Sequence, residues 1–247
     1  MLQVSEARGA AFIVLIDPDK QPAAGLPPVI TACEEVGVDA LFLGGSLMHA
    51  GEFDAYVREL KLETQLPVIG FPGSVSQVSG WLDAILFLSL VSGRNPEHLI
   101  GQHVYASPKL HKLKLETIAT AYMLVESGAL TAAQYMSGTT PLPRSKPDIA
   151  VATALAAEMM GMRLHYLDAG SGAKNLVPLE MISAVAEICR RPLMVGGGLR
   201  TPQDVSDRIR AGAKLIVVGN AIEDRPDRGY IAELAAAAHS EIPRPLS

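Results

Sequence analysis

The stretch "LMVGGGLRTPQD", residues 193–204, ends an apolar run in three consecutive glycines and then continues toward a helix. Glycine loses more conformational freedom on folding than any other residue, so three in a row need a local reason. One reason is the close approach of bare backbone to an anionic ligand, and the other is a tight turn before a helix. Beyond the glycines, Thr201 suits an N-cap, Pro202 the first helical position and Gly212 a stop. The stretch therefore predicts a strand that leads directly into a helix.

The same strand-and-helix unit recurs along the chain. Continuous apolar, β-branched runs, which are typical of buried parallel strands, cover residues 12–17, 40–45, 67–72, 84–90, 117–125, 164–170, 192–198 and 215–220. Helical patterns separate most of them. Eight strands with mostly helical connections predict an α/β fold, a single (β/α)8 TIM barrel. A doubly wound open sheet is the alternative, but polar residues at strand ends along the whole chain favour the barrel.

Two connections depart from the regular pattern. Only "GSVSQVSGWLD", residues 73–83, separates the third strand from the fourth, which is barely enough for a crossover with a helix. The helix at this place, the third of the barrel, is therefore expected to be abbreviated or missing, which would open the barrel wall. Residues 126–147 are long for a connection between a strand and a helix, and such loops are often lids.

Composition narrows the functional classes. The 247 residues are 49% hydrophobic, which fits one sizeable core and one domain over residues 1–247. A net charge of −5 argues against a nucleic-acid partner, because binding to phosphate backbones needs a basic face. Cys33 and Cys189 fit buried thiols better than a disulfide or a metal site. No signal peptide or membrane-spanning run is visible, so the expected location is cytoplasmic.

In a TIM barrel, functional residues gather at the carboxyl ends of the strands. The glycine-rich sequences "GSG" (170–172), "GGG" (196–198) and "VGN" (218–220) end the sixth, seventh and eighth strands. Backbone amides at these three ends commonly bind a phosphate in this fold. We therefore interpret the glycine triplet as bare backbone for a phosphate, with three unrelated turns as the alternative. This predicted phosphate site has no lysine of its own.

Two carboxylates also stand at strand ends. Asp17 ends the first strand in "LIDPDK", and its hard oxygens suit Mg²⁺, to which the Ser46 hydroxyl could add a ligand. Turn or cap residues are the alternative for both positions. Asp168 interrupts an apolar strand, so it is a candidate general base, or else a hydrogen-bonded structural residue. Tyr166 shares its face and is expected to hold it.

The histidines have no metal-ligand spacing. Five of the six, His103 among them, are typical of helix or loop surfaces, and His165 should face away from Asp168.

Taken together, these motifs resemble one enzyme family over about residues 12–223. The sequences "LIDPDK", "FLGGSL", "YMSGTTPLP", "YLDAGSGA", "VGGGLR" and "IVVGNAIE" are similar to those of geranylgeranylglyceryl phosphate synthases, also described as heptaprenylglyceryl phosphate synthases. The resemblance implies a TIM barrel that needs Mg²⁺ and joins sn-glycerol 1-phosphate to a polyprenyl diphosphate, forming an ether-lipid precursor. It also suggests a homodimer or a larger assembly. One position departs from the family, which usually has Glu where this chain has Asp168.

The resemblance also assigns roles to residues. Asp17 and Ser46 match the metal positions, while Asp168 and Tyr166 match the catalytic ones. Asp168 would orient and deprotonate the glycerol hydroxyl, while Mg²⁺ on Asp17 would neutralise the diphosphate leaving group. The residues that match the glycerol phosphate site are Tyr166, Leu167, Asp168, Ala169, Gly170, Ser171, Gly172, Gly197, Gly198, Gly219 and Asn220.

The prenyl tail would lie beside the abbreviated third helix, near Trp81, Leu82 and Phe87. Two other functions stay open on the residues alone. A sugar-phosphate isomerase could use the same phosphate site with Asp17 and Asp168 as acid and base. A barrel without activity could serve as a partner subunit.

Overall fold

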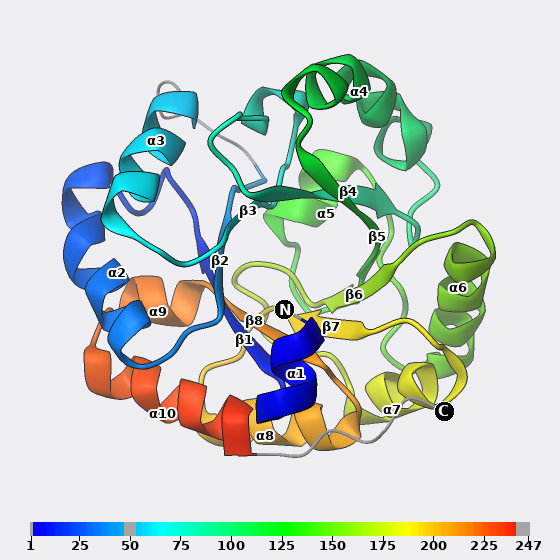
Figure 1. Cartoon of the computed structure of the whole chain (residues 1–247). Coiled ribbons are helices and arrows are strands. Elements are labelled where there is room, and N and C mark those ends of the chain that lie inside the picture. Colours follow the sequence, from blue (N-terminus) through cyan, green and yellow to red (C-terminus); the bar gives the residue numbers. More distant parts are fainter. Residues whose placement is uncertain (1, 47–52, 241–247) are drawn as a thin grey trace.

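The computed structural model describes residues 2–46 and 53–240. Eight parallel strands pair in sequence order, and the eighth pairs with the first, so the sheet closes into a barrel (Figure 1). The expected TIM barrel is therefore confirmed, and the open sheet is wrong. The strands are β1 (Ala11–Ile16), β2 (Ala40–Leu43), β3 (Val68–Gly70), β4 (Ala84–Leu90), β5 (Glu116–Leu124), β6 (Leu164–Asp168), β7 (Leu193–Gly196) and β8 (Leu215–Val218).

Most of the helices surround the barrel on the outside, whereas α5 (Ala132–Ser137) lies at the barrel mouth and lines a cavity there (Figure 1). The other helices are α1 (Leu2–Arg8), α2 (Leu26–Glu35), α3 (Phe53–Glu63), α4 (Gln102–Leu113), α6 (Pro147–Met159), α7 (Leu179–Ile188), α8 (Pro202–Ala211), α9 (Asn220–Asp224) and α10 (Arg228–Ser240). Helix α1 differs from the others because it lies across the end of the barrel where the strands begin, and its Val4 packs against the barrel interior. In the described part of the chain, no helix combines the length and the apolar run needed to cross a membrane.

Helix α8 begins and ends where its sequence predicts. The Thr201 hydroxyl accepts a hydrogen bond from the Asp204 backbone N–H at 3.1 Å, and the Asp204 carboxylate accepts one from the Thr201 N–H at 2.9 Å. This reciprocal capping box satisfies two N–H groups that have no partner inside the helix. Pro202 is the first helical residue, and Gly212 ends the helix with φ of 122°. The N-cap at Thr201 thus fixes the end of the turn that carries the glycine triplet.

Alternating side chains divide the core into an inner and an outer layer. Along β6, Leu164 and Tyr166 pack inside the barrel, whereas Leu167 packs in the outer layer between the barrel and the helices. His165 therefore points outward, as expected, and Asp168 points inward at the strand's carboxyl end. Both cysteines are buried free thiols, also as expected.

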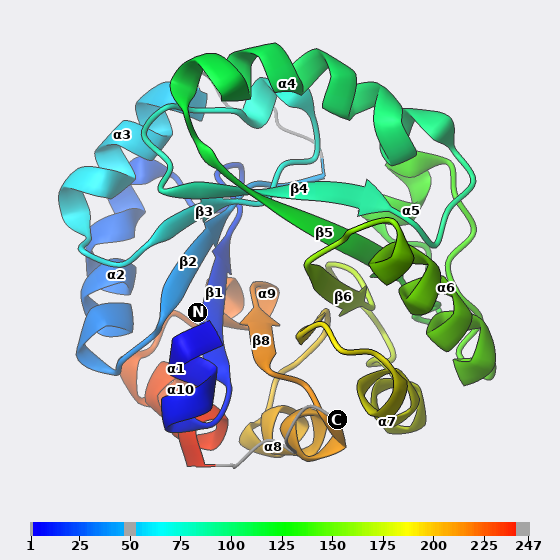
Figure 2. The same ribbon diagram turned by 45° about the vertical axis from the view of Figure 1, so that its right-hand side comes forward.

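The connection from β3 to β4 has no α-helix. A 3₁₀ turn, η2 (Val75–Gln77), stands in its place, so the expectation of an abbreviated helix is confirmed. A small apolar cluster joins this turn, β4 and α4, with Val78, Ile85, Ala106 and Leu110 buried in it. Figure 2 shows α4 lying over β4 at this part of the wall. The long segment 126–147, by contrast, carries the short helix α5.

Candidate active site

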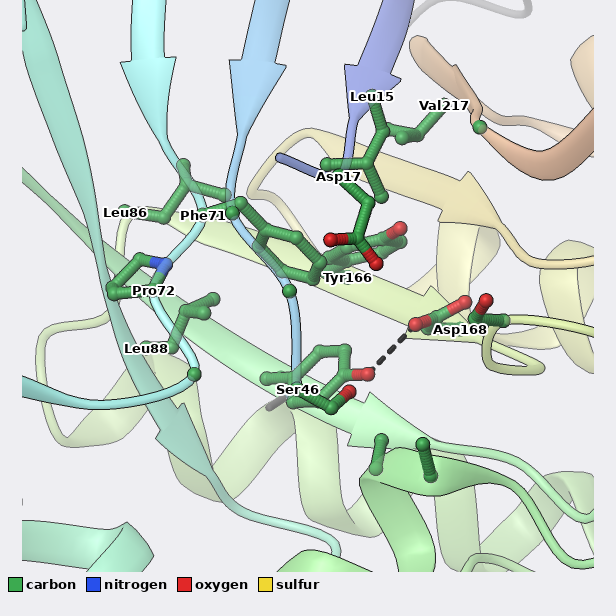
Figure 3. Close-up of a pocket in the computed structure, with 18 of the residues that line it drawn as sticks. Leu15, Asp17, Ser46, Phe71, Pro72, Leu86, Leu88, Tyr166, Asp168 and Val217 are labelled. Atoms are coloured by element: carbon green, nitrogen blue, oxygen red, sulfur yellow. Dashed lines mark hydrogen bonds between the residues drawn. The ribbon is translucent and has the colours of Figure 1, made fainter. Parts of the chain in front are cut away.

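A large cavity opens at the carboxyl ends of the strands and has a volume of about 320 Å³. This size falls within the usual range for small-molecule sites. Asp17, Ser46 and Asp168, which are far apart in the sequence, all line it (Figure 3). One end of the cavity is polar and glycine-rich, and the other is apolar.

Asp168 lies at the polar end and is only 5% exposed. Its Oδ2 accepts a hydrogen bond from the Tyr122 hydroxyl at 2.7 Å, the dashed line in Figure 3, and its Oδ1 accepts one from the Gly170 backbone N–H at 2.8 Å. Burial raises the pKa of Asp168, while these two donors lower it by a smaller amount. The carboxyl is thus held in place and is a stronger base than an exposed aspartate.

Tyr122 rather than Tyr166 holds Asp168. It comes from β5, where it pairs with Tyr166 in register, and the two rings lie 5.4 Å apart. Tyr166 is 1% exposed and points toward Gly196, where a Cβ atom would come within 2.5 Å of its hydroxyl. The expectation that Tyr166 supports the carboxylate is therefore corrected. Tyr122 does so because its side chain also points inward, on the strand next to β6.

The glycine triplet is explained first by packing. A Cβ on Gly197 would lie 2.6 Å from Asp168 Oδ1 and 2.6 Å from the Gly170 backbone nitrogen. A Cβ on Gly198 would lie 2.9 Å from Leu176. Both glycines also have left-handed backbone, with φ of 84° and 77°. The end of β7 thus approaches the end of β6 too closely for side chains, and the same bare backbone faces the cavity.

The other predicted phosphate-site residues divide between the cavity and the outer core. Ser171, Gly172, Gly219 and Asn220 line the cavity together with Gly197 and Gly198. The side chains of Leu167 and Ala169 pack in the outer layer instead. Leu167 and Ala169 belong to the predicted site only because they lie between Tyr166 and Gly170 in the sequence. Neither is part of the described cavity lining.

Lys20 lies against the predicted phosphate site, which corrects the expectation that the site has no lysine. Its Nζ lies 3.4 Å from both Ser171 Oγ and Asn220 Oδ1, and Ser171 Oγ donates to Asn220 Oδ1 at 2.8 Å. The lysine comes from the loop after β1, the strand next to β8 in the closed sheet. An ammonium at this place can neutralise a phosphate.

Asp17 and Glu223 form the acidic side of the polar end. Lys20 Nζ lies 3.7 Å from Asp17 Oδ2 and 3.1 Å from Glu223 Oε2, and Glu223 also accepts a hydrogen bond from the Asp17 backbone. Burial raises the pKa of Glu223, and Lys20 lowers it by less. Sequence reasoning did not select Glu223, although it lies in the "IVVGNAIE" motif.

The space beside Asp17 fits a small cation. A Cβ on Gly45 would come within 2.9 Å of Asp17 Oδ1, so the glycine keeps one side of the carboxylate clear. Ser46 follows directly and lines the same cavity. Two hard oxygen donors beside open space are what Mg²⁺ uses when it also keeps waters and substrate oxygens.

The apolar end of the cavity passes between β4, η2 and α4. Inward and outward side chains of β4 both line it, so the cavity crosses the barrel wall where the α-helix is missing. The apolar residues at this end are Phe71, Val75, Val78, Ile85, Leu86, Phe87, Leu88, Ala106 and Leu110.

Only one of the three residues proposed for the prenyl groove lines this end. Phe87 does, but Leu82 is buried in the core and Trp81 is half exposed, and neither lines the cavity. His103 lines the groove and is 6% exposed, so its assignment to the surface is wrong. Its ring meets the edge of Phe87 at 4.3 Å between centroids, and burial lowers its pKa.

Comparison with known proteins agrees with this site. The geranylgeranylglyceryl phosphate synthase of Chitinophaga pinensis is 47% identical over 233 residues, 94% of this chain and 92% of that protein. The protein of the same name from Korarchaeum cryptofilum is 42% identical over 225 residues, 91% of this chain and 92% of that one. The crystal structure of (S)-3-O-geranylgeranylglyceryl phosphate synthase from Thermoplasma acidophilum, in complex with its substrate sn-glycerol-1-phosphate, has a TM-score of 0.90 at 30% identity and covers 97% of both chains. Residues 2–237 match the PcrB family, and the chain is therefore a member of that family.

Proposed function

We propose that this protein is a geranylgeranylglyceryl phosphate synthase, a prenyltransferase that joins sn-glycerol 1-phosphate to geranylgeranyl diphosphate and so makes an ether-lipid precursor. The observation that carries the proposal is the cavity, whose glycine-rich polar end continues into an apolar groove through the barrel wall. A sugar-phosphate isomerase needs the first part but not the second. The 47% identity to a geranylgeranylglyceryl phosphate synthase over 94% of the chain also favours the prenyltransferase.

The polar end suits the phosphate of glycerol 1-phosphate. Ser171, Asn220 and the Lys20 ammonium meet there, beside the bare backbone of Gly172 and Gly197. Backbone and hydroxyl groups give direction, and the lysine supplies positive charge. Anchoring the phosphate at the ends of β6, β7 and β8 leaves the glycerol hydroxyls beside Asp168, so one of them is oriented for reaction.

Asp168 takes the proton from that hydroxyl. The hydroxyl oxygen then forms a bond to the first carbon of the prenyl chain, while the bond from this carbon to the diphosphate oxygen breaks. The diphosphate leaves with the bonding electron pair, and the proton stays on the carboxyl. Tyr122 and Gly170 fix the carboxylate through one oxygen each, so each oxygen keeps lone pairs for the substrate.

Asp17 and Ser46 would hold Mg²⁺. When bound, this ion supplies positive charge to the departing diphosphate. Glu223 helps to hold Asp17 and Lys20 in place, because it accepts hydrogen bonds from the Asp17 backbone and from Lys20.

The prenyl tail lies in the apolar groove, where it is shielded from water by β4, η2 and α4. Burial of an extended hydrocarbon supplies binding energy roughly in proportion to its length, at about 0.8 kcal/mol for each buried methylene group. The groove thus holds the reacting carbon near Asp168 by binding the distant part of the substrate.

A homo-oligomer is part of the proposal. Val104 and Tyr105 on α4 are 62% and 72% exposed, and Ile100, just before this helix, is 59% exposed. Adjacent apolar side chains of this size are more typical of an interface than of a free surface. Light scattering of the purified protein measures the assembly, and a monomer would contradict this part.

The test of the activity is mass spectrometry of lipid products. The protein is mixed with Mg²⁺, one glycerol phosphate enantiomer and a series of prenyl diphosphates of increasing length. We expect an ether product with sn-glycerol 1-phosphate and much less with sn-glycerol 3-phosphate. Absence of a prenylated product with both enantiomers and all chain lengths would contradict the proposed function.

A further inference from the structure

Three side chains of metal-binding type meet outside the barrel, away from the candidate active site. They are Glu158 on α6, His165 on β6 and Cys189, which directly follows α7. One ligand atom from each lies within 4.8 Å of the other two. The described lining of the active-site cavity includes none of the three. The cluster thus lies in the layer between the barrel wall and two of its covering helices.

The His165 ring is the main indication that this cluster binds a ligand. The residue is 0% exposed, and neither ring nitrogen has a hydrogen-bond partner among the described residues. The Oε1 atom of Glu158 lies 3.5 Å from Nε2. Buried polar atoms in native proteins are nearly always paired, so an imidazole with no partner at Nδ1 and only a long contact with a carboxylate at Nε2 calls for an explanation. A metal ion between the ring, the carboxylate and the thiol would give Nε2 a close partner.

The distances and the donor set fit one class of metal. Ligands about 2.0–2.3 Å from a tetrahedral zinc ion lie roughly 3.3–3.7 Å from one another. The distance from His165 Nε2 to Glu158 Oε1 already matches, and small side-chain rotations would close the remaining ones. An imidazole nitrogen and a thiolate sulfur favour Zn²⁺ over Mg²⁺, which prefers oxygen ligands alone.

Two features of the surroundings bear on binding. The Glu158 side chain is 15% exposed, so a water molecule can reach the fourth position. The Arg191 backbone N–H donates to Glu158 Oε1 at 2.6 Å and so helps to fix the carboxylate. The positive charge of Arg191 also lies close enough to act on His165, and it opposes a cation. Three protein ligands, two of them anionic when metal is bound, outweigh that one charge.

We propose that Glu158, His165 and Cys189 form a structural Zn²⁺ site with water as the fourth ligand. On binding, the Cys189 thiol transfers its proton to solvent, and the thiolate sulfur coordinates the metal. His165 is the second residue of β6, so the site lies toward the amino-terminal face of the barrel, which in this fold serves stability rather than catalysis. The metal would join α6, β6 and the end of α7.

Cobalt provides the direct test, because a thiolate bound to Co²⁺ gives a charge-transfer absorption band. The chain contains a matched control, since Cys33 is also a buried free thiol but belongs to α2. Metal-free protein is titrated with Co²⁺ alone. We expect one equivalent of Co²⁺ to give the band in the wild type and in Cys33→Ser, and no band in Cys189→Ser. No band in the wild type, or a band that persists in Cys189→Ser, would overturn the proposal.

Thermal melts with Zn²⁺ give a second measurement. A Zn²⁺ concentration a hundred times the dissociation constant should raise the Tm of the wild type and of Cys33→Ser by about 5–10 °C. The Tm of Cys189→Ser should not respond. If Cys189→Ser fails to fold, Glu158→Gln tests the site instead, because Glu158 is partly exposed and its replacement should not prevent folding. The Co²⁺ affinity of this variant should fall by about tenfold or more. Unchanged affinity in Glu158→Gln would overturn the site.

Discussion

At the scale of single residues, Asp168 shows a conflict between folding and chemistry. Burial raises the pKa of its carboxyl, so the folded state disfavours the ionised form. By linkage, its contribution to the free energy of unfolding is largest at low pH and is lost as the pH rises through the raised pKa. A general base, however, must be ionised to work. If Asp168 is the base, as proposed, the protein gives up some stability near neutral pH to keep a basic carboxylate in the cavity.

Replacing Asp168 by Asn separates the two roles. The rate should fall by about 10²- to 10⁴-fold, the usual contribution of a general base. The Tm near neutral pH should stay the same or rise, because an uncharged amide takes the place of a buried charge. In the wild type, kcat/KM should rise with pH through a pKa above the ~3.9 of an ordinary aspartate, and the variant should lose that limb. Steady-state kinetics and melts over a pH series measure both effects. A folded variant with the wild-type rate rules out Asp168 as the base.

Tyr122 gives a finer test of the same carboxylate. Its hydroxyl lowers the pKa of Asp168 by donating a hydrogen bond to it. Tyr122→Phe removes the donor, so the acid limb of kcat/KM should move to higher pH, while the rate at alkaline pH recovers most of its wild-type value. An unshifted limb would mean that the hydrogen bond does not tune the base.

Gly197 and Gly161 form a matched pair for the glycine triplet. Both have left-handed backbone, with φ of 84° and 90°, but a Cβ meets Asp168 only at Gly197 and meets nothing within 4 Å at Gly161. Alanine at either position should cost about 1–3 kcal/mol from backbone strain alone. Only Gly197→Ala should also lose activity per folded molecule. Chemical denaturation and turnover measure the two effects, and equal activity in both variants would contradict the packing explanation.

Some residues of the site could be predicted from the sequence, and others could not. Asp17, Ser46 and Asp168 could be predicted because the carboxyl ends of all strands in a closed parallel barrel lie at the same face of the barrel. Lys20, Tyr122 and Glu223 were missed because their roles depend on neighbours about 40 to 200 residues away. An inward-facing tyrosine on the strand next to Asp168 was the available signal for Tyr122.

At the scale of elements, capping residues determine where α8 begins and ends, and their contribution to stability can be measured. Thr201→Ala removes the N-cap acceptor of the capping box and should cost about 1 kcal/mol. In a chain of this size the Tm should fall by roughly 2–4 °C. Thr31→Ala, an exposed threonine inside α2, is the control and should leave the Tm nearly unchanged or raise it slightly. An equal fall in both would mean that the cap contributes nothing specific.

If the apolar groove holds the prenyl tail, as proposed, its α4 face should limit the length of tail that fits. Ala106 lines the apolar end and is 9% exposed, so Ala106→Phe should fill part of the groove. We expect kcat/KM to fall roughly tenfold or more for the longest prenyl diphosphate that the wild type uses, and to change little for the shortest. His111→Phe changes an exposed position on the same helix, outside the described cavity lining, and is the control. Equal losses for all chain lengths would indicate a folding defect instead.

At the scale of the whole molecule, closure of the barrel explains why a sequence could predict so much. Eight apolar runs and their order fix a ring, and the ring brings Asp17 and Asp168 to one mouth from opposite halves of the chain. No comparable rule predicts which side chains meet in the outer layer, between the barrel and its helices. His103, buried over the groove, and the cluster of Glu158, His165 and Cys189 depend on how helices pack against strands, which hydrophobic patterns leave open.

The two ends of the cavity also predict how the molecule depends on metal. In the proposed site, glycerol 1-phosphate is held by Lys20, Ser171 and glycine backbone, and the diphosphate by the metal at Asp17. We therefore expect only the second substrate to need Mg²⁺. In excess chelator, calorimetry should find glycerol 1-phosphate binding nearly unchanged, prenyl diphosphate binding weakened and turnover abolished. Asp17→Asn should reproduce this loss at ordinary Mg²⁺ concentrations. Asp19→Asn, two residues away and outside the described cavity lining, should keep the wild-type metal dependence. Full turnover in chelator would remove Mg²⁺ from the reaction and leave Asp17 as a partner of Lys20 alone.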